Sequence, residues 1–151
     1  MSKALDALGT PAIWREFLFN SVLLTWQAGL LQAKEGNFDK KILDTELGLL
    51  VLRKNRLREM GAAETQFSKH PDEFLVMYRV GPGCASVFKS LRDMTGHGDF
   101  ASHKRGWITI RHRYKGPREK VESTRLFGRL KFQTLKAVVQ FINVGHTRGS
   151  S

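Results

Sequence analysis

The spacing of apolar residues changes along this chain, and that change limits its fold more than any other feature of the sequence. Apolar residues recur at three- and four-residue intervals through most of the first 95 residues, as they do on the buried face of a helix. They alternate with polar and charged residues over 107–114, with the sequence WITIRHRY, which is typical of a strand. The sequence therefore predicts a mostly α-helical protein with a small amount of β-structure.

Capping and helix-breaking residues set the expected element boundaries. Thr10-Pro11 is typical of a helix start, and both Gly36-Asn37 and Gly96-His97-Gly98 are typical of helix ends. The expected helices cover about residues 10–37, 39–60, 71–81, 82–95 and 132–144, and the expected strands cover 107–114 and 124–130. We expect an antiparallel bundle of four to five helices, with a small basic β-hairpin at about 105–130 inserted before the last helix.

A length of 151 residues suits one domain over 1–151, with a loose tail at 145–151. The chain is 41% hydrophobic and 26% charged, so we expect a globular protein rather than a disordered one. A single cysteine, Cys84, excludes an internal disulfide and favours a reducing compartment. Polar residues interrupt the apolar stretch 13–33, and no secretory signal is evident at the start, so we expect a cytoplasmic protein without a membrane span.

Positive charge is concentrated in the last third of the chain. The formal net charge is +11, and residues 101–151 hold 12 Lys and Arg against 2 Asp and Glu. Residues 1–100 are nearly balanced, with 13 against 12. Such a one-sided field attracts polyanions, and the phosphates of RNA or DNA are the usual target. A solvated basic tail and an anionic membrane surface remain the alternatives.

One pair of residues suggests a catalytic site. Arg92 and His97 are separated by four residues at the end of the helix expected over 82–95, where Gly96 and Gly98 free the backbone. The spacing alone is weak evidence, because a second pair, Arg105 and His112, has a similar spacing. On a straight helix the two side chains of the first pair would point about 140° apart. They would converge only if the helix loosens near its end or if a dimer brings two copies together. The plain alternative is a cation near a helix C-terminus and a capping histidine.

The segment Arg92-Asp93-Met94-Thr95-Gly96-His97-Gly98 resembles the motif of the HEPN family, in which an arginine, four to six residues and a histidine end a late helix. The resemblance implies a helical bundle, a homodimer, and metal-independent cleavage of RNA without a cofactor. It also implies a role in a toxin–antitoxin pair or in defence against phage. In such a site His97 moves protons and Arg92 stabilises negative charge on the phosphorane. Asp93 orients one of these side chains or caps the helix.

Basic residues after the motif are the candidates for RNA binding. They are His103, Lys104, Arg105, Arg111, Arg113 and Lys115. A strand face followed by a basic turn suits contacts along a phosphate backbone. Trp107 and Tyr114 are the candidates for stacking on bases, although packing inside the protein is the favoured interpretation for both rings. Neither a zinc-binding spacing nor a phosphate-binding glycine loop is evident.

Two other functions compete with the ribonuclease. The first is a non-catalytic module that binds RNA or nucleotides through its basic hairpin. The second is a small regulator that binds another protein and needs no active residues. A neutralising antitoxin or other partner protein is a further expectation if the ribonuclease hypothesis holds.

Overall fold

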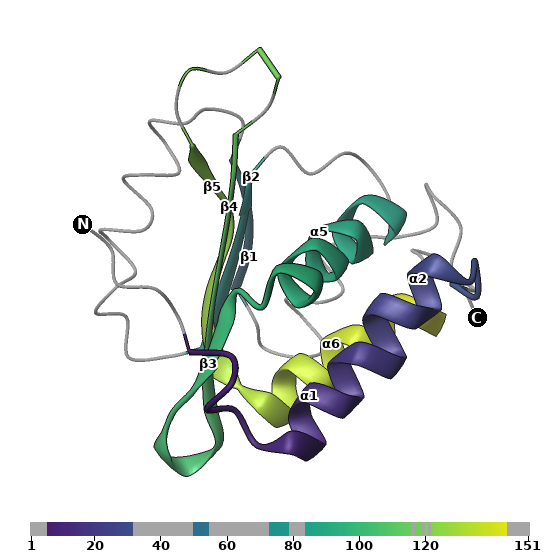
Figure 1. Ribbon diagram of the computed structural model, residues 1–151, viewed down its shortest axis with the longest axis vertical. Coiled ribbons are helices and arrows are strands. Elements are labelled where there is room, and N and C mark those ends of the chain that lie inside the picture. The colour runs from purple at the N-terminus through teal and green to yellow at the C-terminus, as the bar shows by residue number, and fades with distance from the viewer. Residues whose placement is uncertain are drawn as a thin grey trace.

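Five strands form one sheet, and every α-helix that the structure describes lies on the same face of it (Figure 1). The computed structural model describes residues 6–31, 50–54, 73–78, 84–115, 117–118, 120 and 122–144. Within these ranges no helix is both long and apolar enough to cross a membrane.

The sheet is mixed, with one parallel pair at one edge. Its strands are β1 (Leu50–Lys54), β2 (Phe74–Tyr78), β3 (Phe100–Ser102), β4 (Trp107–Tyr114) and β5 (Ser123–Lys131). They lie in the order β1-β2-β5-β4-β3. β1 and β2 are parallel, whereas every other neighbouring pair is antiparallel.

The predicted helical bundle is therefore wrong. Residues 50–54, placed within the helix predicted over 39–60, form β1, and the rest of that segment lies outside the described residues. Residues 74–78, placed within the short helix predicted from Pro71, form β2. Periodicity does not separate a short apolar run in a buried strand from one in a buried helix. Pairing with β5, which is distant in sequence, decides the conformation of β2.

The β-hairpin is present, but it is the centre of the fold rather than an insertion. The strand predicted over 107–114 is confirmed as β4, and the strand predicted over 124–130 is one residue longer at each end in β5. β5 lies between β4 and β2. Ile108, Ile110 and His112 are buried on one face of β4, as their alternation predicts.

Two helices cover the sheet directly. The helix predicted over 132–144 is confirmed as α6 (Phe132–Val144), and the one predicted over 82–95 is confirmed, two residues later, as α5 (Cys84–His97). Figure 1 shows both on the same side of the strands. The core between these layers includes Val87, Phe88, Leu91, Met94, Ile108, Ile110, Leu126, Leu130, Leu135, Val138, Val139 and Ile142.

The N-terminal helix forms a further layer over α5 and α6 (Figure 1). It runs without a break through α1 (Ala12–Leu18), the π-helical η1 (Phe19–Leu24) and α2 (Thr25–Gln27). The ring of Trp14 stacks on Phe132 of α6 with centroids 4.4 Å apart, and Trp26 lies 6.4 Å from Phe88 of α5. The helix predicted over 10–37 closes earlier, because Gly29 has a φ of 67° and follows its last turn. The predicted end at Gly36-Asn37 lies outside the described residues.

Candidate functional site

The C-terminus of α5 turns sharply because of Gly98. Its φ is 68°, a conformation that glycine adopts without steric cost. The Gly98 N–H donates to the Thr95 carbonyl at 3.1 Å, and the Asp99 N–H donates to the Met94 carbonyl at 3.0 Å. These two hydrogen bonds are those of a Schellman motif. The helix end predicted at Gly96-His97-Gly98 is therefore confirmed, and it directs Asp99 towards the sheet.

The turn joins Asp99 to β4. The Arg111 N–H donates to the Asp99 carbonyl at 3.0 Å, which continues the β3–β4 ladder by one step. The carboxylate of Asp99 then reaches the next residue of β4, since its Oδ2 lies 2.7 Å from His112 Nδ1. His112 is only 3% exposed, so this hydrogen bond satisfies a polar group inside the protein.

His97 completes a cluster at this corner. Its ring centroid lies 5.1 Å from that of His112, with an angle of 42° between the ring planes. The side chain of His97 is exposed, whereas that of His112 is buried. We call His97, His112 and Asp99 the histidine cluster.

The cluster combines a buried, oriented imidazole with an exposed one. A carboxylate on Nδ1 of an imidazole fixes the orientation of the ring and favours the tautomer with hydrogen on Nδ1. His112 is held in this way, and it gives the exposed imidazole of His97 a fixed aromatic neighbour. An exposed imidazole can accept and release protons in contact with a ligand.

The strand pairing is irregular beside the cluster. His112 pairs with Leu126, but the next residue, Arg113, pairs with Thr124, so Arg125 is an extra residue in β5. Such a bulge changes the direction of nearby side chains and is common at binding sites. The guanidinium of Arg125 lies 5.5 Å from the ring of Tyr114, which is 48% exposed.

Arg92 and Asp93, predicted to work with His97, have other contacts. Arg92 Nε lies 3.3 Å from Asp93 Oδ1, and the Arg92 guanidinium carbon lies 5.9 Å from the ring centroid of Trp26 in α2. His97 instead contacts His112 in β4. α5 is helical through both positions, so its end does not loosen in the way that convergence of Arg92 and His97 requires. Within one chain the structure brings His97 together with His112, and not with Arg92.

The predicted RNA-binding residues lie in two groups at opposite ends of β4. At its start, His103, Lys104 and Arg105 are exposed, and His103 Nε2 lies 2.8 Å from Thr109 Oγ1. At its end, Arg113 and Lys115 are exposed. The remaining candidate, Arg111, is half-buried on the face of β4 that points away from the helices, with its guanidinium 5.4 Å from the ring of Phe127.

His112 and Asp99 were missed as site residues. A signal for His112 was present, because the alternation of β4 places this histidine on the same face as Ile108 and Ile110. A polar side chain on a buried face needs a hydrogen-bond partner. Nothing in the local sequence identifies Asp99 as that partner, since the contact depends on the pairing of β3 with β4.

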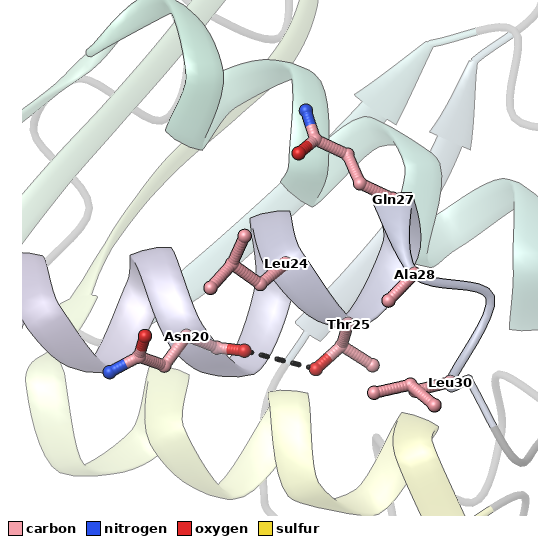
Figure 2. A pocket seen from close by; sticks show the side chains of 6 residues that line it. All are labelled: Asn20, Leu24, Thr25, Gln27, Ala28 and Leu30. Atoms are coloured by element: carbon pink, nitrogen blue, oxygen red, sulfur yellow. Dashed lines mark hydrogen bonds between the residues drawn. The ribbon is translucent and has the colours of Figure 1, made fainter.

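Other candidate sites offer less chemistry. A hollow of about 550 Å³ lies on the exposed side of the N-terminal helix, lined by Asn20, Leu24, Thr25, Gln27, Ala28 and Leu30. Figure 2 shows the hydrogen bond that the Thr25 hydroxyl donates to the Asn20 backbone carbonyl, with a length of 3.1 Å. None of the six lining side chains is ionisable. Over the described part of the chain, no group of three or more His, Cys, Asp or Glu residues is arranged to hold a metal ion.

Comparisons of the chain with protein-family models, with curated proteins and with solved structures give no match. The resemblance to HEPN domains therefore rests on the sequence motif around Arg92 and His97.

Proposed function

We propose that this chain is a metal-independent endoribonuclease in which His97 transfers protons. The observation that carries the proposal is the contact between the exposed ring of His97 and the buried ring of His112, which Asp99 holds. The concentration of positive charge in residues 101–151 supports a nucleic acid as the ligand. RNA is favoured because its 2′-hydroxyl can serve as an internal nucleophile, which needs proton transfer but no metal.

The reaction follows from this chemistry. His97 accepts the proton of the ribose 2′-hydroxyl while the 2′-oxygen forms a bond to the adjacent phosphorus. The bond from phosphorus to the 5′-oxygen breaks, and the imidazolium returns the proton to that oxygen. The products are a 2′,3′-cyclic phosphate and a 5′-hydroxyl end. A positioned histidine contributes typically 10²–10⁴-fold to such a step.

His112 and Asp99 act in this proposal as positioning residues. Because His112 is 3% exposed, it supports the ring of His97 rather than contacting RNA itself. Arg113 belongs to β4 and Lys115 follows the strand, and both are exposed, so we assign them to phosphate contacts at the end of β4 that lies beyond His112.

Features that come from the HEPN resemblance keep a place in the proposal. Arg92 and Asp93 would join the site only from a second copy of the chain, since their contacts within one chain are with Trp26 and with each other. A homodimer, a cytoplasmic location, a role in a toxin–antitoxin pair or phage defence, and a neutralising partner belong to the same part of the proposal.

The test is cleavage of end-labelled RNA by the purified chain in EDTA, with analysis of the product ends. We expect His97→Ala to lower kcat by about 100-fold or more. His112→Phe keeps a ring beside His97 and removes the imidazole, so we expect a smaller loss in kcat with little change in KM. Lys89→Gln is the matched control, because Lys89 is an exposed residue of the same helix, α5. This variant should cleave RNA at the normal rate.

Several outcomes contradict the proposal. Absence of cleavage by the unaltered chain would do so, as would equal cleavage by the His97→Ala variant. Cleavage that requires a divalent ion, or that leaves no cyclic phosphate, would exclude the reaction described above. Thermal unfolding of each variant shows whether a loss of cleavage comes from the missing side chain or from unfolding of the protein.

A further inference from the structure

We propose that the face of β4 and β5 that points away from the helices binds single-stranded RNA, with a base on Trp107 and phosphates on Arg129 and Lys131. The inference rests on the proposed function for its choice of RNA as the ligand. It concerns a surface separate from the histidine cluster, and two of its residues, Arg129 and Lys131, were not among the predicted site residues.

The strand register places these residues on one surface. Trp107 pairs with Lys131, Thr109 with Arg129, and Arg111 with Phe127. Directly paired residues share a face of a sheet, and alternate residues point to opposite faces. Ile108, Ile110 and Leu130 belong to the core on the helical face, so the residues between them point the other way. We call the set of Trp107, Arg111, Phe127, Arg129 and Lys131 the basic ladder.

Each cation of the basic ladder lies near an aromatic ring. The guanidinium carbon of Arg129 is 4.1 Å from the ring centroid of Trp107, and Lys131 Nζ is 5.9 Å from the same centroid. The guanidinium carbon of Arg111 is 5.4 Å from the ring of Phe127. Contact with a ring restrains the orientation of a guanidinium and leaves its positive charge in place, so that the charge attracts phosphate.

Exposure increases along the basic ladder towards the β3–β4 turn. Phe127 is 4% exposed, and Phe74, which contacts it from β2, is fully buried. Trp107 and Arg129 are half-buried, and Lys131 is exposed. Three further exposed residues of the adjoining turn extend the basic surface, namely His103, Lys104 and Arg105. Among the described residues, Glu73 brings a carboxylate to this end, where its Oε1 accepts the backbone N–H of Lys131 at 2.7 Å. A ligand therefore meets the end of the surface that carries Trp107.

The mixture of rings and cations favours an unpaired strand over a duplex. A duplex presents its phosphates and hides the faces of its bases, so it would use the cations and not the indole. An unpaired strand offers both phosphates and base faces, and stacking on an aromatic side chain accommodates any base. The basic ladder and the histidine cluster lie on opposite faces of β4, so an RNA strand that contacts both must pass around an edge or an end of the sheet.

The test measures binding of a fluorescent 2′-O-methyl RNA oligonucleotide, which cannot be cleaved by attack of its 2′ position. Anisotropy gives the Kd, and tryptophan emission reports stacking. We expect the double variant Arg129→Gln/Lys131→Gln to weaken binding by about tenfold or more, and an abasic strand of equal length to bind about tenfold more weakly than the oligonucleotide with bases. Stacking of a base on Trp107 should quench tryptophan emission when the oligonucleotide binds. This quenching should disappear in Trp107→Phe, which removes the indole but keeps an aromatic ring.

The matched control is Lys89→Gln/Lys136→Gln, which removes the same charge from the helical side. Lys136 also lies on a ring, with its Nζ 5.5 Å from the ring centroid of Phe17. This control should bind the oligonucleotide with an unchanged Kd. If it weakens binding as much as the ladder variant does, or if duplex RNA, heparin or the abasic strand binds as tightly as the oligonucleotide with bases, the inference is wrong.

The outcome is separable from that of the proposed function. Repeating the titration with His97→Ala and unmodified RNA should give the same Kd, whether or not the unaltered chain cleaves RNA. If binding follows these expectations but no RNA is cleaved, the proposed ribonuclease function is wrong and the proposed binding of RNA by the basic ladder is supported. If His97→Ala abolishes cleavage but Arg129→Gln/Lys131→Gln binds RNA normally, only the proposed binding of RNA by the basic ladder is wrong.

Discussion

Gly98 links the end of α5 to the histidine cluster through its backbone conformation. Its φ of 68° allows the two hydrogen bonds that close the helix and direct Asp99 towards His112. A Cβ atom at this position would also lie 3.4 Å from the Cβ of Ala7. The orientation of the cluster therefore depends on a residue that takes no part in its chemistry.

We predict that Gly98→Ala lowers the free energy of unfolding by about 1–2 kcal/mol, the usual cost of a left-handed conformation for a residue with a Cβ. Cleavage of RNA should fall as well, because Asp99 and His97 flank the turn. Gly29→Ala is the matched control, with a φ of 67° and open space around the new Cβ. It should destabilise the protein by a similar amount in chemical denaturation and leave cleavage intact. Equal losses of cleavage in both variants would argue against this role.

Individual residues also show what the sequence could predict about the site. His97 stands out because its motif is local, and the glycines around it identify a helix end. Its partner is fifteen residues away in β4, and the contact exists only because β3 returns beside β4. Asp99 has the same dependence. A local motif could therefore predict one member of the histidine cluster, whereas the other two needed the strand pairing.

At the scale of elements, the close approach of β2 to β5 depends on Gly128. A Cβ added there would lie 2.8 Å from Leu75 Cδ1 and 3.0 Å from the Phe74 carbonyl oxygen. Both neighbours belong to β2, a segment whose sequence predicts a helix. Substitution of Gly128 thus tests whether residues 74–78 pair with β5.

We predict that Gly128→Ala lowers the free energy of unfolding by about 1–3 kcal/mol through overpacking. Gly96→Ala is the control with the opposite sign. Its new Cβ would lie 3.6 Å from Leu23 Cδ1, an ordinary contact, and alanine should stabilise α5 by about 0.5–1 kcal/mol. Urea denaturation measures both. An unchanged stability in Gly128→Ala would contradict the pairing of β2 with β5.

The elements that the sequence predicts well are those with a long and regular pattern. α6 and β4 match the predicted ranges 132–144 and 107–114 because thirteen and eight residues keep one periodicity throughout. β1 and β2 have only five residues each, and their runs of apolar residues suit a helix equally well. Their conformation is decided by neighbours in the sheet, which no local pattern contains.

At the scale of the whole molecule, the layers divide the charge. All described α-helices cover one face of the sheet (Figure 1), while the basic ladder lies on the other face. Exposed basic residues lie at both ends of β4. The charge asymmetry was predictable, because the excess lies in residues 101–151. Its division between two surfaces follows from the sheet, and the helical bundle that the sequence predicted would not have produced it.

This distribution predicts a salt-dependent affinity for RNA. The logarithm of the binding constant should fall linearly with the logarithm of the salt concentration, with a slope of about 0.7 for each phosphate neutralised on a single strand. Removing Arg129 and Lys131 by substitution with glutamine should lower the magnitude of the slope by about 1.4. Anisotropy titrations at several salt concentrations measure this. An affinity that is independent of salt would contradict electrostatic binding by these surfaces.

The joint action of His97 and His112 is tested most directly by a double-mutant cycle on RNA cleavage in EDTA. The variants are His97→Ala, His112→Phe and the double substitution, each with its rate of formation of 2′,3′-cyclic phosphate. If His112 acts through His97, the double variant should cleave no more slowly than His97→Ala alone, because the second loss has already occurred. Losses that multiply in the double variant, or a His112→Phe variant as active as the unaltered chain, would contradict a shared site.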